Sequence, residues 1–266
     1  MRRALLLATA LVTIDPASAG PDPTRDVLWA ALKTCILAKR FADRPFPCLA
    51  VDLGDADRPG TAILRAPGRS AHFVVMPTDT VSGVEAPVLR GPRGAAYWRA
   101  ALAARHLVSD AVRDGRAAED VGLAVNSVGG RSQDQLHIHL ACVRPGVASA
   151  LKRTADGLGS TWRPLPVRLQ GSRFFALRLD EAGLTAFNPF NALAHLPGRA
   201  ASLRDVSLAM VAVPPRASPA ATEIGPVRTA ATGPDPGRAR DFVLLAYRAP
   251  SAHAEKLLDP SCTAVR

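Results

Sequence analysis

Aromatic residues are scarce in this sequence. Phe, Trp and Tyr together make up 5% of the 266 residues, which argues against a surface that stacks nucleic-acid bases on aromatic rings. Lysine is scarce too, because among 33 basic residues it occurs only at positions 33, 39, 152 and 256. The arginines are scattered without a long basic run, although the formal net charge is +10. This charge favours an anionic lipid or nucleotide partner, and no nucleic acid is expected.

Long hydrophobic runs are absent after the N-terminus, so no later segment is long enough to cross a bilayer. The N-terminus has Arg2 and Arg3, an uncharged and mostly apolar stretch over residues 4–14, and then Ala17-Ser18-Ala19. This order is typical of a secretory signal peptide. Residues 1–19 are therefore predicted to be a signal peptide or a short N-terminal anchor. A buried N-terminal helix is the alternative.

Cysteine occurs only four times, and the spacings do not match a zinc site. An even number of cysteines in an exported chain predicts two disulfides, for which three pairings exist. Cys35 and Cys48 are close in sequence and flank a proline-rich turn, so we pair them. Cys142 and Cys262 then form the second disulfide, which ties the C-terminal tail back to the middle of the chain. Four free thiols are the alternative.

The apolar patterns predict a mixture of helices and strands. A hydrophobic content of 48% is enough for one large or two small domains. Thr24 is the expected N-cap of the first helix. Helices are predicted over residues 24–40, 94–112, 147–155 and 189–196. Strands are predicted over 48–51, 61–64, 72–76, 121–126, 135–143, 174–179, 206–213 and 241–248. Residues 77–92 form a long loop, and the stretch 214–240, rich in Pro, Ala, Gly and Thr, is predicted to be an exposed and partly disordered loop.

The most informative stretch lies at residues 135–139, which follow a glycine-rich turn. Side chains alternate along a strand, so Gln135, His137 and His139 face one way, and the apolar residues between them face the core. The turn at Gly129-Gly130 supplies backbone N–H groups that can hold an anion. Together these features predict a phosphate site with a histidine positioned to attack.

The run from Asn126 to Pro145 resembles the histidine-triad (HIT-like) superfamily, and within it the bacterial CDP-diacylglycerol pyrophosphatases. The similarity extends over residues 24–262, and all four cysteines fall where that family places cysteines. Further matching stretches are Leu28-Trp29, Pro47-Cys48, Met76-Pro77-Thr78, Trp162-Arg163-Pro164, Pro189-Phe190 and Phe242-Val243-Leu244. The implied fold is α+β, an antiparallel meander sheet with packed helices. The catalytic region is expected over 20–158, with residues 159–266 extending or duplicating the sheet.

The resemblance implies hydrolysis of CDP-diacylglycerol to CMP and phosphatidate. His137 matches the middle histidine, which attacks the phosphorus attached to the nucleoside, and His139 matches the last histidine. Gln135 stands where the superfamily has its first histidine, and glutamine carries no proton charge. The expected phosphate or nucleotide contacts are Asn126, Gly130, Ser132 and Gln135, with Thr78, Glu85 and Arg131 as further candidates.

The same resemblance implies no metal and no other cofactor. The expected partners are CDP-diacylglycerol and an anionic membrane surface, and the expected location is the periplasm, in association with the inner membrane. Three alternatives remain. His137 and His139 could chelate zinc with His72 or Glu85 as third ligand. The chain could also hydrolyse or transfer from another nucleotide anhydride, or it could be a non-catalytic lipid- or nucleotide-binding module.

Overall fold

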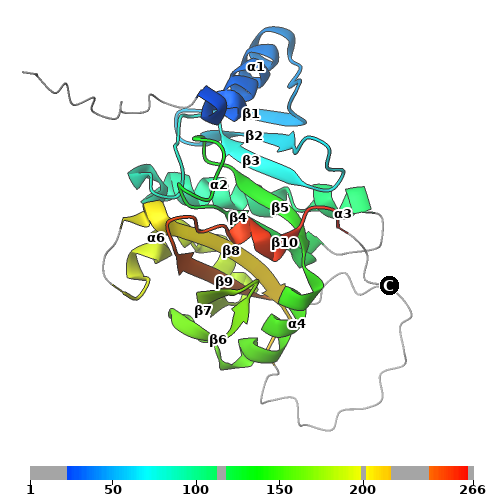
Figure 1. The fold of residues 1–266 in the computed structure, drawn as a ribbon. Helices are drawn as coiled ribbons and strands as arrows, with labels where there is room; N and C mark the ends of the chain where they lie inside the picture. Colours follow the sequence, from blue (N-terminus) through cyan, green and yellow to red (C-terminus); the bar gives the residue numbers. More distant parts are fainter. Residues whose placement is uncertain (1–22, 113–117, 199–201, 217–239, 263–266) are drawn as a thin grey trace, which may run out of the picture.

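One antiparallel sheet organises the molecule, and helices cover both of its faces (Figure 1). The computed structural model describes residues 23–112, 118–198, 202–216 and 240–262. The strands are β1 (Ala50–Gly54), β2 (Pro59–Arg65), β3 (Phe73–Pro77), β4 (Val121–Val125), β5 (Ile138–Val143), β6 (Arg163–Leu169), β7 (Ser172–Leu179), β8 (Val206–Val213), β9 (Asp241–Arg248) and β10 (Leu258–Asp259). The α+β class predicted from the sequence is confirmed.

The strand order is β1-β2-β3-β5-β4-β8-β9-β7-β6, and β10 pairs with β5. The order departs from a simple meander, because β5 lies between β3 and β4, and β8 pairs with β4. The second half of the chain thus extends the sheet of the first half, as predicted. In the register, His139 pairs with Val74 of β3 on one side and with Ala124 of β4 on the other.

The helices lie on opposite faces of the sheet (Figure 1). The α-helices are α1 (Val27–Ala42), α2 (Pro92–Ala103), α3 (His106–Val112), α4 (Pro145–Thr154), α5 (Glu181–Ala186) and α6 (Pro189–Ala192). The short 3-10 helices are η1 (Pro23–Asp26), η2 (Pro87–Arg90), η3 (Ala118–Asp120), η4 (Ala155–Gly157), η5 (Leu193–His195), η6 (Leu203–Asp205) and η7 (Ala254–Leu257). One face packs on α2, α3, α5 and α6 through a core that includes Trp98, Ile138 and Phe190. The other face packs on α4 and, over β1–β3, on α1.

Several elements differ from the prediction, and four of the differences have a clear physical meaning. The first α-helix begins at Val27, so Asp26 rather than Thr24 holds the N-cap position, and its side chain makes no cap hydrogen bond. The expected helix over 94–112 is interrupted after Ala103 and continues as α3. The strand β5 begins at Ile138 rather than at residue 135. The strand β6 was missed, because Pro164 and Pro166 argue against a central strand; β6 lies at the sheet edge, where proline is tolerated.

Both predicted disulfides are confirmed. The Cys35–Cys48 bond joins α1 to the segment before β1, and the Cys142–Cys262 bond joins β5 to the C-terminal segment. Such bonds fit an exported protein. The predicted signal or anchor at residues 1–19 and most of the predicted loop at 214–240 lie outside the described residues. Within the described ranges, no helix is both long and apolar enough to cross a membrane.

Candidate active site

The two histidines of the 135–139 stretch are buried at the start of β5. His137 and His139 are each 7% exposed, and their rings lie edge to face with centroids 4.8 Å apart. The alternation predicted from the sequence holds although Gln135 and His137 precede the strand, because Leu136, Ile138 and Leu140 all join the opposite core. The backbone N–H of Leu136 donates to the carbonyl of Val81, which fixes this approach to the strand.

The hydrogen bonding of His137 leaves one ring nitrogen with a lone pair. Its Nδ1 lies 2.6 Å from the carbonyl oxygen of Gln135. A carbonyl oxygen only accepts, so Nδ1 carries the hydrogen and Nε2 is the basic nitrogen. Burial lowers the pKa of His137, while the Gln135 carbonyl and the charge of Glu255 oppose that shift. The ring is therefore neutral at pH 7, as a nitrogen nucleophile must be.

His139 lies within a group of polar side chains from distant segments. Its Nδ1 is 3.0 Å from Nε2 of His72, and its Nε2 is 3.3 Å from a carboxylate oxygen of Glu255 but makes no well-aligned hydrogen bond. Burial, followed by the charge of His137, holds the pKa of His139 well below its usual value. Burial also lowers the pKa of His72, against the attraction of Glu255.

Glu255 of η7 is the residue that sequence reasoning missed. One of its oxygens accepts a hydrogen bond from Asn126 at 3.0 Å and lies 3.1 Å from Nε2 of His253. The Glu255 backbone N–H donates to the amide oxygen of Asn126. Burial would raise the pKa of Glu255, but the hydrogen bond from His253 and the charges of His139 and His72 hold it far below its usual value. The predicted disulfide at Cys262 was the available signal, since it returns this segment to β5.

A metal-ligating group exists here, but it differs from the one considered from the sequence. The ligand atoms of His72, His139 and Glu255 lie within 4.8 Å of one another. His137 is not part of that group, and its Nδ1 is bonded to a carbonyl. Glu85 is bonded to Arg131 instead. A divalent ion held by these three residues would therefore leave the Nε2 lone pair of His137 outside its ligand set.

Gln135 holds the loop that follows β3. Its amide nitrogen donates to the carbonyls of Pro77 and Asp79, and its amide oxygen accepts from Val81 N–H. Thr78, a predicted candidate, lies in this loop, where its N–H donates to Gly60. The hydrogen bonds of Gln135 are thus used to shape the site wall, which favours a positioning role over a direct contact with a nucleotide.

Arg131 and Glu85, both predicted as candidates, bind each other. Two parallel hydrogen bonds of 2.8 Å join the guanidinium to the carboxylate, and Arg131 also donates to Asp134 at 3.0 Å. A hydrogen bond from Arg25, aided by Arg131 and opposed by burial, lowers the pKa of Asp134 to about 2. The pair braces the loop before His137 and leaves Arg131 no free donor face for a phosphate.

The glycine-rich turn is built differently from the predicted anion cradle. Gly130 N–H donates to the backbone and side-chain oxygens of Ser127. A Cβ at Gly130 would lie 2.0 Å from the carbonyl oxygen of Ala252, and one at Gly129 would lie 2.1 Å from that of Pro250. The glycines are therefore needed for close backbone packing. Ser132 is exposed in this turn and remains available for a ligand.

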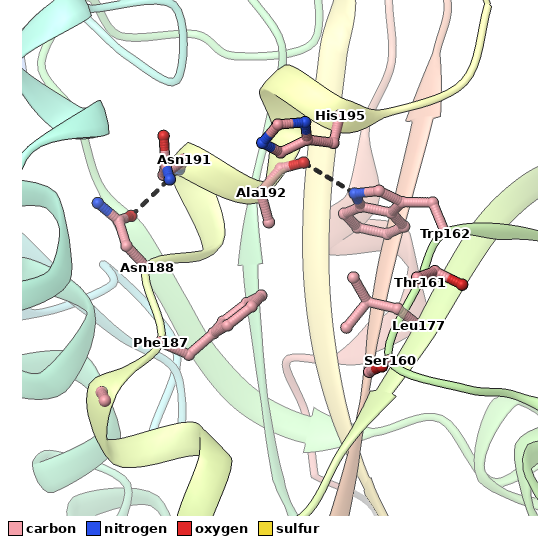
Figure 2. Close-up of a pocket in the computed structure, with 10 residues that line it drawn as sticks. Ser160, Thr161, Trp162, Leu177, Phe187, Asn188, Asn191, Ala192 and His195 are labelled. Atoms are coloured by element: carbon pink, nitrogen blue, oxygen red, sulfur yellow. Dashed lines mark hydrogen bonds between the residues drawn. The ribbon is translucent and has the colours of Figure 1, made fainter.

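A pocket of about 700 Å³ lies away from His137 and His139. Figure 2 shows Trp162, Leu177 and Phe187 lining it, with His195 at one side. Trp162 Nε1 donates to the carbonyl of Ala192. Trp162 and Leu177 belong to the core on the face opposite His139. None of the residues lining this pocket was predicted as a site residue.

The fold and the histidine group define an α+β protein with a buried imidazole site built from segments that lie far apart in the sequence. A family model described as CDP-diacylglycerol pyrophosphatase matches residues 23–221. A CDP-diacylglycerol pyrophosphatase from Yersinia pestis is 30% identical over 244 residues, covering 89% of this chain and 84% of the relative. One from Mycobacterium tuberculosis is 32% identical over 188 residues, covering 70% and 71%. The chain belongs to the CDP-diacylglycerol pyrophosphatase family, a family of hydrolases.

Proposed function

We propose that this protein hydrolyses CDP-diacylglycerol to CMP and phosphatidate through a covalent CMP–histidine intermediate. The observation that carries the proposal is the pairing of His137 Nδ1 with the Gln135 carbonyl, which presents the Nε2 lone pair of a neutral ring. The family description supports the substrate. The neutral ring of His137 supports its assignment as the nucleophile that attacks the anhydride bond. The hydrolysis would take place outside the cytoplasm, at the outer surface of the inner membrane.

The proposed reaction has two steps. The lone pair of His137 Nε2 forms a bond to the cytidylyl phosphorus, and the bond from that phosphorus to the phosphatidate oxygen breaks. Phosphatidate departs with the electron pair and needs little proton donation, because a phosphate is a good leaving group. Water then bonds to the same phosphorus, the phosphorus–nitrogen bond breaks, CMP leaves, and the proton from water is released to solvent. The Gln135 carbonyl stabilises the positive ring in the intermediate.

The neighbouring residues have supporting roles in this proposal. His139 packs against the ring of His137 and is assigned to orient it and to contact the phosphate oxygens, together with Ser132. Asn126 positions Glu255 through two hydrogen bonds, and Gln135 holds the 77–81 loop. Thr78 remains a candidate contact of the nucleoside. The HIT-like assignment of residues 20–158 is part of the same proposal.

The first test replaces the nucleophile. His137→Ala is expected to lower CMP release from CDP-diacylglycerol by about a thousandfold or more, because no other group would attack the phosphorus. His106→Ala is the matched control, since that ring lies exposed on α3 and bonds to Ala103. Equal rates for His137→Ala and the parent would remove the catalytic role and leave a binding module.

A second measurement addresses which phosphorus reacts. Hydrolysis in water enriched in heavy oxygen is expected to place the label in CMP, and rapid acid quenching should trap a CMP adduct that mass spectrometry maps to His137. Label found only in phosphatidate would contradict the proposed attack. Comparing CMP release from CDP-diacylglycerol and from a soluble CDP-alcohol separates a lipid hydrolase from a general nucleotide hydrolase. Activity retained after chelation and metal analysis would exclude a required ion at His72, His139 and Glu255.

A further inference from the structure

Large apolar side chains are exposed mainly in one region of the described chain. Phe41 is 85% exposed, Phe46 77%, Val27 62% and Leu37 53%. Together with Leu53 they form what we call the α1 apolar surface, and beyond it only Leu49 and Val88 are similarly exposed large hydrophobic residues in the described ranges. Single exposed apolar residues are ordinary, but a concentration of five on one helix, the turn after it and the following strand indicates an interaction surface.

The geometry of α1 gathers these residues into a stripe. The outward positions recur every three or four residues, which places them on one side of a helix; they are Val27, Ala30, Thr34, Leu37 and Phe41. The opposite side buries Leu32 and Cys35 against the sheet. Because the inner side already forms a complete core with β1, β2 and β3, the outer stripe is not needed for folding.

The strand β1 continues the surface at the sheet edge. Side chains alternate along a strand, so Leu53 points to the same face as Val51, which is buried under α1. Leu49 precedes β1 and lines a pocket with Phe73 and Leu107 of the opposite core, so it is not part of this surface. Phe46 lies in the turn between α1 and β1, next to Cys48 and its disulfide to Cys35. Figure 1 shows α1 beside β1 at the outer edge of the molecule. The Cys35–Cys48 disulfide therefore links the helix, turn and strand that carry this surface.

The α1 apolar surface lies on the same sheet face as the candidate catalytic group. Val74 packs in the core beneath α1 and is the strand partner of His139. The start of α1 is bonded to the loop before His137: Arg25 donates to Asp134 at 2.6 Å, and Leu28 N–H donates to Gln133 at 2.7 Å. A ligand spread along α1 would thus reach the edge of the active site.

We propose that the α1 apolar surface docks the protein on a bilayer containing anionic lipids, with Phe41 and Phe46 placed among the acyl chains. Three exposed cations, at Lys33, Arg40 and Arg44, border the apolar residues and would meet lipid phosphates. These cations disfavour a second copy of the chain as the occupant, because a twofold contact would bring the same charges together. The inference deepens the proposed function, since the substrate of that reaction resides in a membrane.

The decisive test reports on depth in the bilayer. Full-length Phe41→Trp is mixed with phosphatidylcholine–phosphatidylglycerol vesicles, some of which carry brominated acyl chains. The parent chain carries tryptophans at 29, 98 and 162, so its spectrum is subtracted. The remaining emission, which comes from position 41, is expected to shift to the blue and to be quenched by the bromine atoms. Val88→Trp, at an exposed site outside the α1 apolar surface, serves as the control and should show neither effect. An unquenched tryptophan at position 41 would overturn the proposal, even if the chain binds vesicles through another segment.

A binding measurement separates docking from catalysis. Phe41→Ser with Phe46→Ser is expected to weaken vesicle partitioning by about tenfold or more in co-sedimentation, because two apolar rings no longer leave water. Val88→Ser should bind as the parent does. Hydrolysis of a water-soluble short-chain CDP-diacylglycerol should be unchanged in the double variant. If the parent shows no hydrolysis while partitioning still falls, the proposed function fails and the docking surface stands. Unchanged partitioning of the double variant would refute docking. Docking would also be refuted if the parent formed a dimer and bound no vesicles, while the double variant was a monomer.

Discussion

At the scale of single residues, the carboxylate of Glu255 is the unusual component of this site. A negative charge near a phosphate site would repel the substrate unless other groups balance it. Three imidazoles, of His72, His139 and His253, lie within 3.1 to 3.7 Å of its oxygens. Their protonation and the charge of Glu255 are therefore linked, and Glu255 also favours the protonated form of His137. The carboxylate thus sets how readily the neighbouring rings take up protons.

Replacing this charge should change the pH dependence in a defined direction. Glu255→Gln removes a charge that raises the pKa of His137, so the pKa of His137 should fall further below its usual value. The neutral nucleophile would then persist to lower pH, and the acid limb of kcat/KM should move to lower pH. Glu181→Gln, on exposed α5, is the control with an unchanged profile. Superimposable acid limbs for both variants would show that Glu255 does not act on His137.

The site residues that could be predicted from the sequence lie close together along the chain, whereas those that could not be predicted lie far from them. His137, His139 and Gln135 follow from local alternation, which needs only a strand-like backbone. Their partners come from segments far away, since 67 residues separate His72 from His139 and 129 separate Glu255 from Asn126. Spacing patterns carry no information over such distances, and only the predicted Cys142–Cys262 bond indicated that the tail returns to β5.

At the scale of elements, the turn between β4 and β5 has a packing role that the sequence did not indicate. The glycines at 129 and 130 were expected to expose N–H groups to an anion. Gly130 N–H is instead bonded within the turn, and both glycines face the backbone of residues 250 and 252. The turn therefore fixes the segment that leads to Glu255, although the turn and this segment are widely separated in the sequence.

Adding a methyl group at this turn should displace that segment. Gly130→Ala would place a Cβ 2.0 Å from the Ala252 carbonyl oxygen, so the chain must move there. We expect a loss of about 1–3 kcal/mol in the free energy of unfolding and a matching loss of activity, measured by urea denaturation and CMP release. Gly146→Ala, in α4, meets no atom within 4 Å and should be neutral or stabilising. Equal behaviour of the two variants would contradict this packing role.

The predicted strand boundaries depended on how the apolar runs end. The limits of β8 and β9 match the prediction, because each is a mostly apolar segment of eight residues bounded by polar or proline-rich sequence. The strand β6 lacks such a run, because its two prolines interrupt the apolar pattern. Proline has no N–H to donate, and it is tolerated here because β6 lies at the edge of the sheet. The pairing of β4 with β8 had no local signal at all.

At the scale of the whole molecule, the two halves of the chain share a strand order. The path β2-β3-β5-β4 in the first half corresponds to β6-β7-β9-β8 in the second, and β4 pairs with β8 at the centre. In both halves, helices connect the corresponding strands: α2 and α3 lie between β3 and β4, and α5 and α6 lie between β7 and β8. This correspondence supports the proposal that residues 159–266 are a degenerate second copy without the histidine pair. The halves nevertheless share one core, to which Leu123, Met210 and Leu244 contribute.

A shared core and the central β4–β8 pairing predict that the halves unfold together. In a Trp29→Phe, Trp98→Phe variant, the remaining Trp162 packs on α6 and reports on the second half alone. Its fluorescence in urea should change at the same midpoint as the far-ultraviolet circular dichroism, which reports on both halves. The converse variant, Trp162→Phe, should again give coincident transitions from the first half. Fluorescence and dichroism midpoints that separate would mean that each half is stable without the other, because the interactions across β4 and β8 would then contribute too little to couple them.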